Sequence, residues 1–151
     1  MAHPNIKDLL ERRKQSTATY TPFPLISEIT ASGEEAVVFR NPCGHSRHEI
    51  PGLVSLDHLL GGFTEVMVVH HTDCGTLHFK NEQIKDVLVA RGAVQTEVEG
   101  MYFGGIDDLE QSVKDDVAIL KNSHLMRPEL KEQIRGFVFD IQTGKLSEVD
   151  L

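Results

Sequence analysis

A short apolar run that ends in a cluster of polar side chains constrains this chain more than any other feature. The run from Val66 to Val69 is rich in β-branched residues, which is typical of a buried strand. It leads directly into the string His70-His71-Thr72-Asp73-Cys74-Gly75. In open α/β sheets, ligands bind at the carboxyl ends of the strands. The sequence therefore predicts a functional site at the end of this strand.

His71 and Cys74 have a spacing that lets one turn offer two ligands to a single metal ion. An imidazole nitrogen and a thiolate are ligands that Zn²⁺ takes in tetrahedral geometry. A catalytic zinc needs three protein ligands and one open position. The pair therefore predicts zinc binding and requires a third ligand from elsewhere.

The rest of the chain alternates between helical and strand-like patterns. We expect helices at 5–15, 51–60, 81–91 and 107–121, with a short helical turn at 128–133. We expect strands at 36–39, 65–70, 137–141 and 146–149, and a loop at 93–105. This order predicts an α/β fold with a mainly parallel β-sheet flanked by helices and an antiparallel C-terminal hairpin.

Length, charge and cysteine content narrow the class of protein. The 151 residues fit a single domain, 1–151, in which 1–24 form an N-terminal helix and an extended arm. A net charge of −8 argues against nucleic acid or an anionic membrane as a partner. No apolar run approaches the length of a membrane span, and no signal-peptide core is visible. Two cysteines make no disulfide framework, so we expect a reducing, cytoplasmic compartment.

Three stretches resemble the β-class carbonic anhydrases. The string from His70 to Gly75 resembles the second zinc motif of that family, Val37–Gly44 resembles its strand and R-N-x-G turn, and Gly136–Leu146 resembles its C-terminal hairpin. The resemblance extends from about Glu35 onward. It implies a β-carbonic-anhydrase-like fold, one Zn²⁺ per chain, and the interconversion of CO2 and bicarbonate. In that family such an N-terminal helix packs on the partner subunit, and the helix at 5–15 either does so here or packs on its own core. This apolar helix and a missing strand of the sheet would leave apolar surface exposed in a monomer, so we expect a homodimer.

One family motif is absent. The first zinc motif, C-x-D-x-R, has no counterpart, and the segment between Pro24 and Glu35 is too short to hold its strand. If the strand at 36–39 instead pairs in parallel with the strand at 65–70, Cys43 reaches the same end of the sheet as the other two ligands. We therefore expect Cys43 as the third zinc ligand, with burial in a turn as the alternative. His45 and His48 are alternative ligands, although loop histidines are commonly solvated.

Two further residues are candidates for catalysis. Arg40 matches the arginine of the R-N-x-G turn and either binds an anion such as bicarbonate or has a structural role. Asp73 lies between the two ligands, where it either bonds the backbone of the turn or orients a neighbouring group. His70 is expected on the opposite side of the strand from His71, as a packing residue. His58, His78 and His124 are expected on the surface.

The sequence supports two functions of different kinds. The first is a zinc enzyme that hydrates CO2 or carries out a related hydrolase or lyase reaction, with weak hydratase activity because the Asp–Arg pair of C-x-D-x-R is missing. The second is a non-catalytic remnant of the fold that associates with itself or with a full-length relative. A third explanation is that the chain is shortened by mis-splicing or by an error in the gene model.

Overall fold

The computed structural model describes residues 37–151, which form one of the two units into which the chain divides. The expected helix at 5–15 and the extended arm up to residue 24 lie outside the described residues. The assignment of all 151 residues to a single domain therefore stays a prediction.

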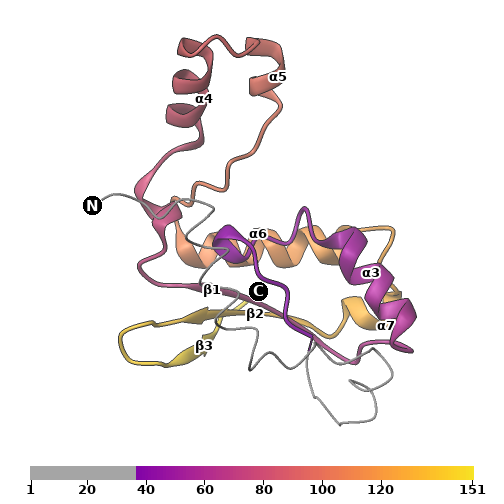
Figure 1. The fold of residues 1–151 in the computed structure, drawn as a ribbon. Helices are drawn as coiled ribbons and strands as arrows, with labels where there is room; N and C mark the ends of the chain where they lie inside the picture. The colour runs from indigo at the N-terminus through magenta and orange to yellow at the C-terminus, as the bar shows by residue number, and fades with distance from the viewer. Residues whose placement is uncertain (1–36) are drawn as a thin grey trace, which may run out of the picture. The chain divides into compact units, whose positions relative to one another are not determined.

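A sheet of three strands lies at the centre of the described residues, in the order β1-β2-β3. Its strands are β1 (Val66–His71), β2 (Ile134–Phe139) and β3 (Leu146–Glu148). β1 and β2 run parallel, and β2 and β3 form an antiparallel hairpin, which Figure 1 shows in yellow. The predicted α/β fold and the C-terminal hairpin are confirmed.

Helix α6 (Leu109–Asn122) confirms the helix expected at 107–121, and it lies along one face of the sheet (Figure 1). The side chain of Asp108 accepts a hydrogen bond of 2.9 Å from the backbone N–H of Gln111. This cap satisfies one of the backbone donors that the first turn of a helix leaves free.

The core lies between α6 and the two parallel strands. Its buried members are Leu53, Val68, Val113, Val117, Leu120, Met126, Leu130, Ile134 and Val149. Gly136 of β2 permits the close approach of the helix, because a Cβ atom there would lie 2.5 Å from Cγ1 of Val113. The packing of α6 on β2 thus depends on the absence of a side chain at this position.

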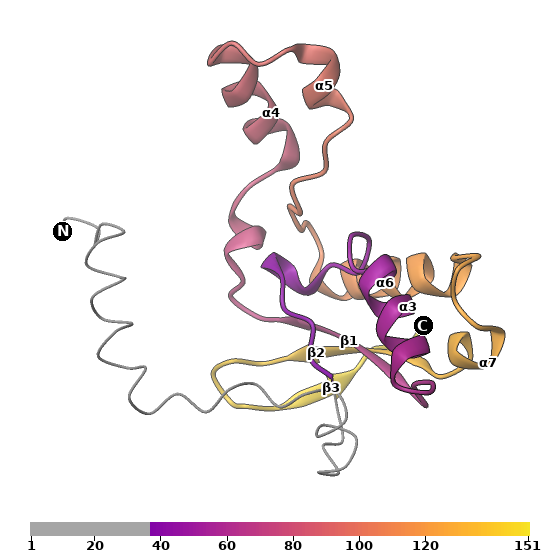
Figure 2. The same cartoon turned by 45° about the vertical axis from the view of Figure 1, so that its right-hand side comes forward.

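The remaining helices surround this core or extend from it. They are α3 (Ile50–Leu59), α4 (Asn81–Ala90), α5 (Gln95–Glu99) and α7 (Pro128–Lys131), with the 3₁₀ turns η2 (Pro42–Gly44) and η3 (Gly75–His78). α4 and α5 lie beside each other and extend away from the sheet (Figures 1 and 2). The prediction of a loop throughout 93–105 is wrong at α5. No helix within residues 37–151 combines the length and the apolar character that crossing a bilayer requires.

The predicted buried strand at 36–39 is wrong for its described residues. Val37–Arg40 have no regular secondary structure, and the side chain of Val38 is 67% exposed. A strand needs a neighbour to bond its backbone, and within residues 37–151 the only strand that pairs with β1 is β2. The family's missing strand has therefore not been replaced by direct pairing of this segment with β1.

Candidate functional site

The predicted ligand pair lies at the carboxyl end of β1. His71 is the last residue of the strand, and Cys74 caps the start of η3 three residues later. Nδ1 of His71 donates a hydrogen bond of 2.8 Å to the carbonyl oxygen of Thr72. Because this bond places the proton on Nδ1, the lone pair of Nε2 is available to bind a metal ion.

The thiol of Cys74 is buried and accepts a hydrogen bond from a nearby hydroxyl. The hydroxyl of Thr76 donates a hydrogen bond to its sulfur across 3.1 Å. Asp73, between the two predicted ligands, has a φ of 55°, a left-handed conformation that reverses the chain within the turn. Its side chain is exposed and lies 3.7 Å from Nε2 of His78.

The other predicted site residues lie on the segment before α3. Arg40 is exposed at the end of the irregular stretch. Cys43 is in η2, and its side chain is not among those that the structure describes. The backbone of η2 lies against β1, because a Cβ atom on Gly44 would meet the carbonyl oxygen of Val69 at 2.6 Å. The assignments of Arg40, Asp73 and Cys43 stay predictions.

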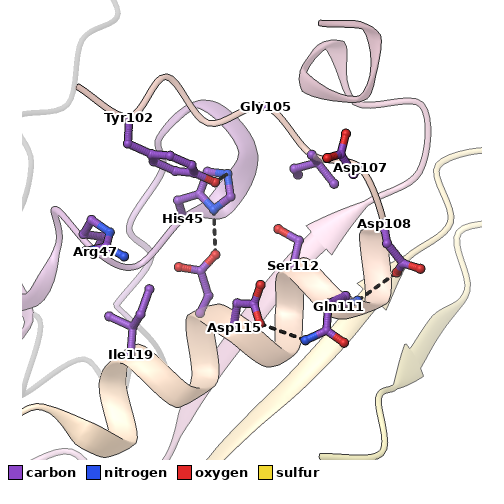
Figure 3. Close-up of a pocket in the computed structure, with 12 residues that line it drawn as sticks. His45, Arg47, Tyr102, Gly105, Asp107, Asp108, Gln111, Ser112, Asp115 and Ile119 are labelled. Carbon is purple, nitrogen blue, oxygen red and sulfur yellow. Dashed lines mark hydrogen bonds and ion pairs between the residues drawn. The ribbon is translucent and has the colours of Figure 1, made fainter. Parts of the chain in front are cut away.

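A second polar cluster lies on the α6 side of β1. It joins His45 from the loop after η2, His70 from β1 and Asp116 from α6, and all three side chains are buried. Nδ1 of His45 donates a hydrogen bond of 2.6 Å to Oδ2 of Asp116 (Figure 3). Nε2 of His70 lies 3.3 Å from the same oxygen. We call these three residues the histidine–aspartate cluster.

The other carboxylate oxygen of Asp116 is held by Ser46. Oδ1 accepts hydrogen bonds from the backbone N–H of Ser46 at 2.7 Å and from its hydroxyl at 2.8 Å. Burial alone would raise the pKa of the Asp116 carboxyl, but the imidazoles of His45 and His70 and the bonds from Ser46 outweigh it. The pKa of Asp116 is consequently held well below its usual range, and this carboxylate stays ionised.

The two histidines of the cluster differ in their bonding. Nε2 of His45 lies 3.3 Å from the carbonyl oxygen of Gly104 and 3.3 Å from the hydroxyl of Tyr102. The bond to Asp116 raises the pKa of His45 above its ordinary value, against the opposing effect of burial. His70 is only 1% exposed, yet neither of its ring nitrogens has a hydrogen-bond partner in the described part of the chain.

A cavity of about 390 Å³ opens beside this cluster (Figure 3). Its lining residues are His45, Arg47, Tyr102, Gly105, Ile106, Asp107, Asp108, Gln111, Ser112, Asp115, Asp116 and Ile119. Four of these are aspartates, whereas Arg47 is the only lysine or arginine among them, so the lining favours a positively charged ligand.

The expectation that His45 is solvated is wrong, whereas His48 is exposed as expected of a loop histidine. His70 is a buried residue on the opposite face from His71, as the alternation of a strand predicts.

Sequence reasoning missed Asp116. The observation that could have found it is its position on the apolar stripe of α6, three residues after Val113 and four before Leu120.

The fold and the site together define an α/β protein with candidate ligands at the carboxyl end of its parallel strands. Over 117 residues the chain is 31% identical to beta-carbonic anhydrase 1 of Mycobacterium tuberculosis, an alignment that covers 76% of this chain and 68% of that protein. The chain therefore belongs to the β-carbonic anhydrase family. No protein-family model matches it.

Two other relatives show the range of the similarity. The carbon disulfide hydrolase of Acidianus sp. is 27% identical over 134 residues, covering 75% of this chain and 65% of that protein. The crystal structure of the carbonic anhydrase from Streptococcus mutans matches with a TM-score of 0.72 and 25% identity, covering 99% of this chain and 100% of that one.

At the position of the family's second zinc motif, the described residues offer the types of ligand that zinc prefers but too few of them. His71 and Cys74 offer the nitrogen and sulfur ligands that zinc takes. Within residues 37–151, however, neither belongs to a group of three His, Cys, Asp or Glu side chains whose ligand atoms meet. Among the described side chains, which do not include that of Cys43, the pair is thus one protein ligand short of a catalytic zinc site.

Proposed function

We propose that this protein is a zinc enzyme that adds water to CO2 or to a related small carbon compound. The observation that carries the proposal is the placement of His71 and Cys74 in one turn at the carboxyl end of β1, where folds of this class bind ligands. Relatives named beta-carbonic anhydrase and carbon disulfide hydrolase support linear three-atom carbon compounds as the substrate class.

Two features prepare the pair for a metal ion. The bond from Nδ1 of His71 to the carbonyl of Thr72 fixes the ring so that Nε2 is the ligand atom, which is how metal-binding histidines are commonly oriented. The hydroxyl of Thr76 donates to the sulfur of Cys74. Such a bond is stronger to a thiolate than to a thiol, so it favours the form that binds zinc.

We propose Cys43 as the third ligand. The close packing of Gly44 on Val69 puts the backbone of η2 beside the carboxyl end of β1, which supports this assignment. The alternatives are less suitable, because His45 is engaged by Asp116 and His48 is exposed.

The chemistry that zinc supplies at such a site is the activation of water, whose pKa falls to about 7 when it is a ligand. In the proposal, the exposed guanidinium of Arg40 attracts bicarbonate, and Asp73 forms the left-handed turn between the two ligands. The chain has no counterpart of the Asp–Arg pair of C-x-D-x-R. We therefore expect weaker CO2 hydration than in complete members of the family.

We further propose that the protein is a cytoplasmic homodimer. Met67 and Val69 point away from α6 on β1 and are 52% and 39% exposed. Exposed apolar side chains that gather on one surface commonly mark an interface. Sedimentation velocity should show a dimer, and a monomer over the whole range of dilution would contradict this assignment.

A second candidate function is a non-catalytic protein that keeps the family fold for association with itself or with a full-length relative. The missing third ligand among the described side chains favours this candidate. It predicts a stable dimer with no turnover of either substrate.

Assays of two reactions separate the candidates. We would measure CO2 hydration by stopped flow and carbon disulfide hydrolysis by sulfide release, using zinc-loaded protein. The enzyme proposal predicts a rate above that of buffer with at least one substrate, and a loss of at least tenfold in Cys74→Ser and in His71→Ala. His124→Ala, which removes an exposed histidine, should keep the wild-type rate. Wild-type protein at the rate of buffer with both substrates would overturn the enzyme proposal.

A further inference from the structure

We propose that the histidine–aspartate cluster, formed by His45, His70 and Asp116, is a binding site for a divalent transition-metal ion of the zinc class. The site is separate from the pair formed by His71 and Cys74. Because successive side chains of a strand point to opposite faces, His70 faces α6 and His71 faces away from it. The proposal does not depend on the proposed enzymatic function.

The three side chains already form a ligand set. They come from a loop, a strand and a helix, and their ligand atoms all lie within 4.8 Å of one another. His45, His70 and Asp116 are 8%, 1% and 2% exposed. Two imidazoles and one carboxylate are the donors preferred by zinc, cobalt, nickel and iron, whereas magnesium and calcium prefer oxygen ligands alone.

The bonding of His70 points to a missing ligand. Its imidazole is buried with no hydrogen bond from either ring nitrogen to the described residues. Buried polar groups nearly always have partners, so an unpaired one requires an explanation. Nε2 of this ring lies 3.3 Å from Oδ2 of Asp116. A cation bound between the two atoms would accept the lone pair of Nε2 and balance the negative charge of the carboxylate.

The surrounding groups orient the other two ligands. Ser46 holds Oδ1 of Asp116, which leaves Oδ2 for the metal. The carbonyl of Gly104 lies 3.3 Å from Nε2 of His45 and can accept its proton, which leaves Nδ1 as the ligand atom. Ligating histidines commonly donate their other N–H to a carbonyl or a carboxylate in this way.

Metal binding at this site exchanges a proton for the ion. In the structure a proton lies between Nδ1 of His45 and Oδ2 of Asp116, whose separation is 2.6 Å. The metal takes the lone pairs of both atoms, so this proton is released to solvent. The aspartate-rich cavity beside the cluster supplies a route of entry that attracts cations, and it leaves room for water as a fourth ligand.

The test uses the full chain with His71→Ala and Cys74→Ser combined, so that the predicted family site is removed. Metal-free protein is titrated with Co²⁺ alone and then with Zn²⁺ alone. The proposal predicts one bound cobalt ion without the near-ultraviolet absorption of a sulfur-to-cobalt bond. Adding Asp116→Asn should weaken this binding at least tenfold, and Asp86→Asn, which changes an exposed aspartate outside the cavity, should leave it unchanged.

Two results would overturn the proposal: no cobalt binding to the double variant, or equal affinity in Asp116→Asn and Asp86→Asn. If Asp116→Asn does not fold, as judged by circular dichroism, X-ray absorption of zinc bound to the double variant decides instead. Scattering from two imidazoles would support the site. Scattering from one imidazole, from none, or from sulfur would overturn it.

Discussion

Nδ1 of His45 donates a hydrogen bond of 2.6 Å to Oδ2 of Asp116 across 71 positions of the sequence. The bond fastens the loop after η2 to the middle of α6. Together with the two bonds from Ser46 to the same carboxylate, it fixes this loop on the side of the sheet opposite His71.

The first prediction concerns the stability that this network supplies. Asp116→Ala removes the acceptor for His45 and for two groups of Ser46, and it leaves buried donors without partners. Breaking a buried ion pair by removing one partner costs about 3–5 kcal/mol, and we expect a loss of that size in urea denaturation. Asp115→Ala should cost less than about 0.5 kcal/mol, as is usual for exposed positions. Equal losses in the two variants would contradict a structural role for the network.

The second prediction concerns the contact of α6 with β2. Gly136→Ala would place a Cβ atom 2.5 Å from Cγ1 of Val113. Overpacking of a core costs about 1–3 kcal/mol, so thermal unfolding should begin at a lower temperature than in the wild type. Gly100→Ala is the control, because the nearest atom to its new Cβ would be 3.9 Å away. An unchanged melting temperature in Gly136→Ala would contradict the close packing of α6 on β2.

The third prediction concerns acid stability. Arg127 donates hydrogen bonds of 2.7 and 2.8 Å to the carboxylate of Asp57, and the backbone N–H of Phe63 donates another of 2.6 Å. The bonds from Arg127 lower the pKa of Asp57 against the opposing effect of burial. Because the folded pKa lies below the unfolded value of 3.8, the ionised carboxylate stabilises the fold above pH 3.8.

This stabilisation is lost as the pH falls below 3.8 and through the lowered pKa of the folded state. Asp57→Asn should be less stable than the wild type at neutral pH, and the difference should shrink as the pH falls through this range. Exposed Asp86 supplies the control. Asp86→Asn should differ little from the wild type at any pH. A constant difference between Asp57→Asn and the wild type would contradict the assignment.

The fourth prediction concerns Cys43, where the chain departs from its family. If Cys43 is the third ligand, Cys43→Ser should weaken zinc binding at the His71–Cys74 pair at least tenfold, because zinc binds the deprotonated thiol far better than a hydroxyl. A competition titration against a coloured chelator measures this affinity. The fold should be intact by circular dichroism, and unchanged affinity would remove Cys43 from the site.

Local sequence patterns predicted the elements that carry a clear apolar pattern over several residues. The apolar stripe from Leu109 to Leu120 was enough to predict α6, and the run ending in His70 was enough to predict β1 and its polar end. Such a pattern shows that one face of the element is buried. It does so whichever part of the chain covers that face.

Features that depend on distant partners could not be predicted in the same way. His45 follows a glycine in a loop, and its burial depends on residues far along the chain, which are Tyr102, Gly104 and Asp116. The segment 37–40 has strand-forming residues but no described neighbour to pair with. The helix α5 spans only Gln95–Glu99 and is too short and too polar to produce a helical period.

The most direct test of zinc binding by His71 and Cys74 is a comparison of zinc content. It compares the wild type with the His71→Ala, Cys74→Ser double variant. Both proteins are expressed in excess zinc, passed through gel filtration and analysed for metal per chain. The proposed function predicts that the wild type carries about one zinc ion per chain more than the double variant, whatever the histidine–aspartate cluster holds. Equal zinc content in the two proteins would contradict zinc binding by His71 and Cys74, and with it the proposed enzyme.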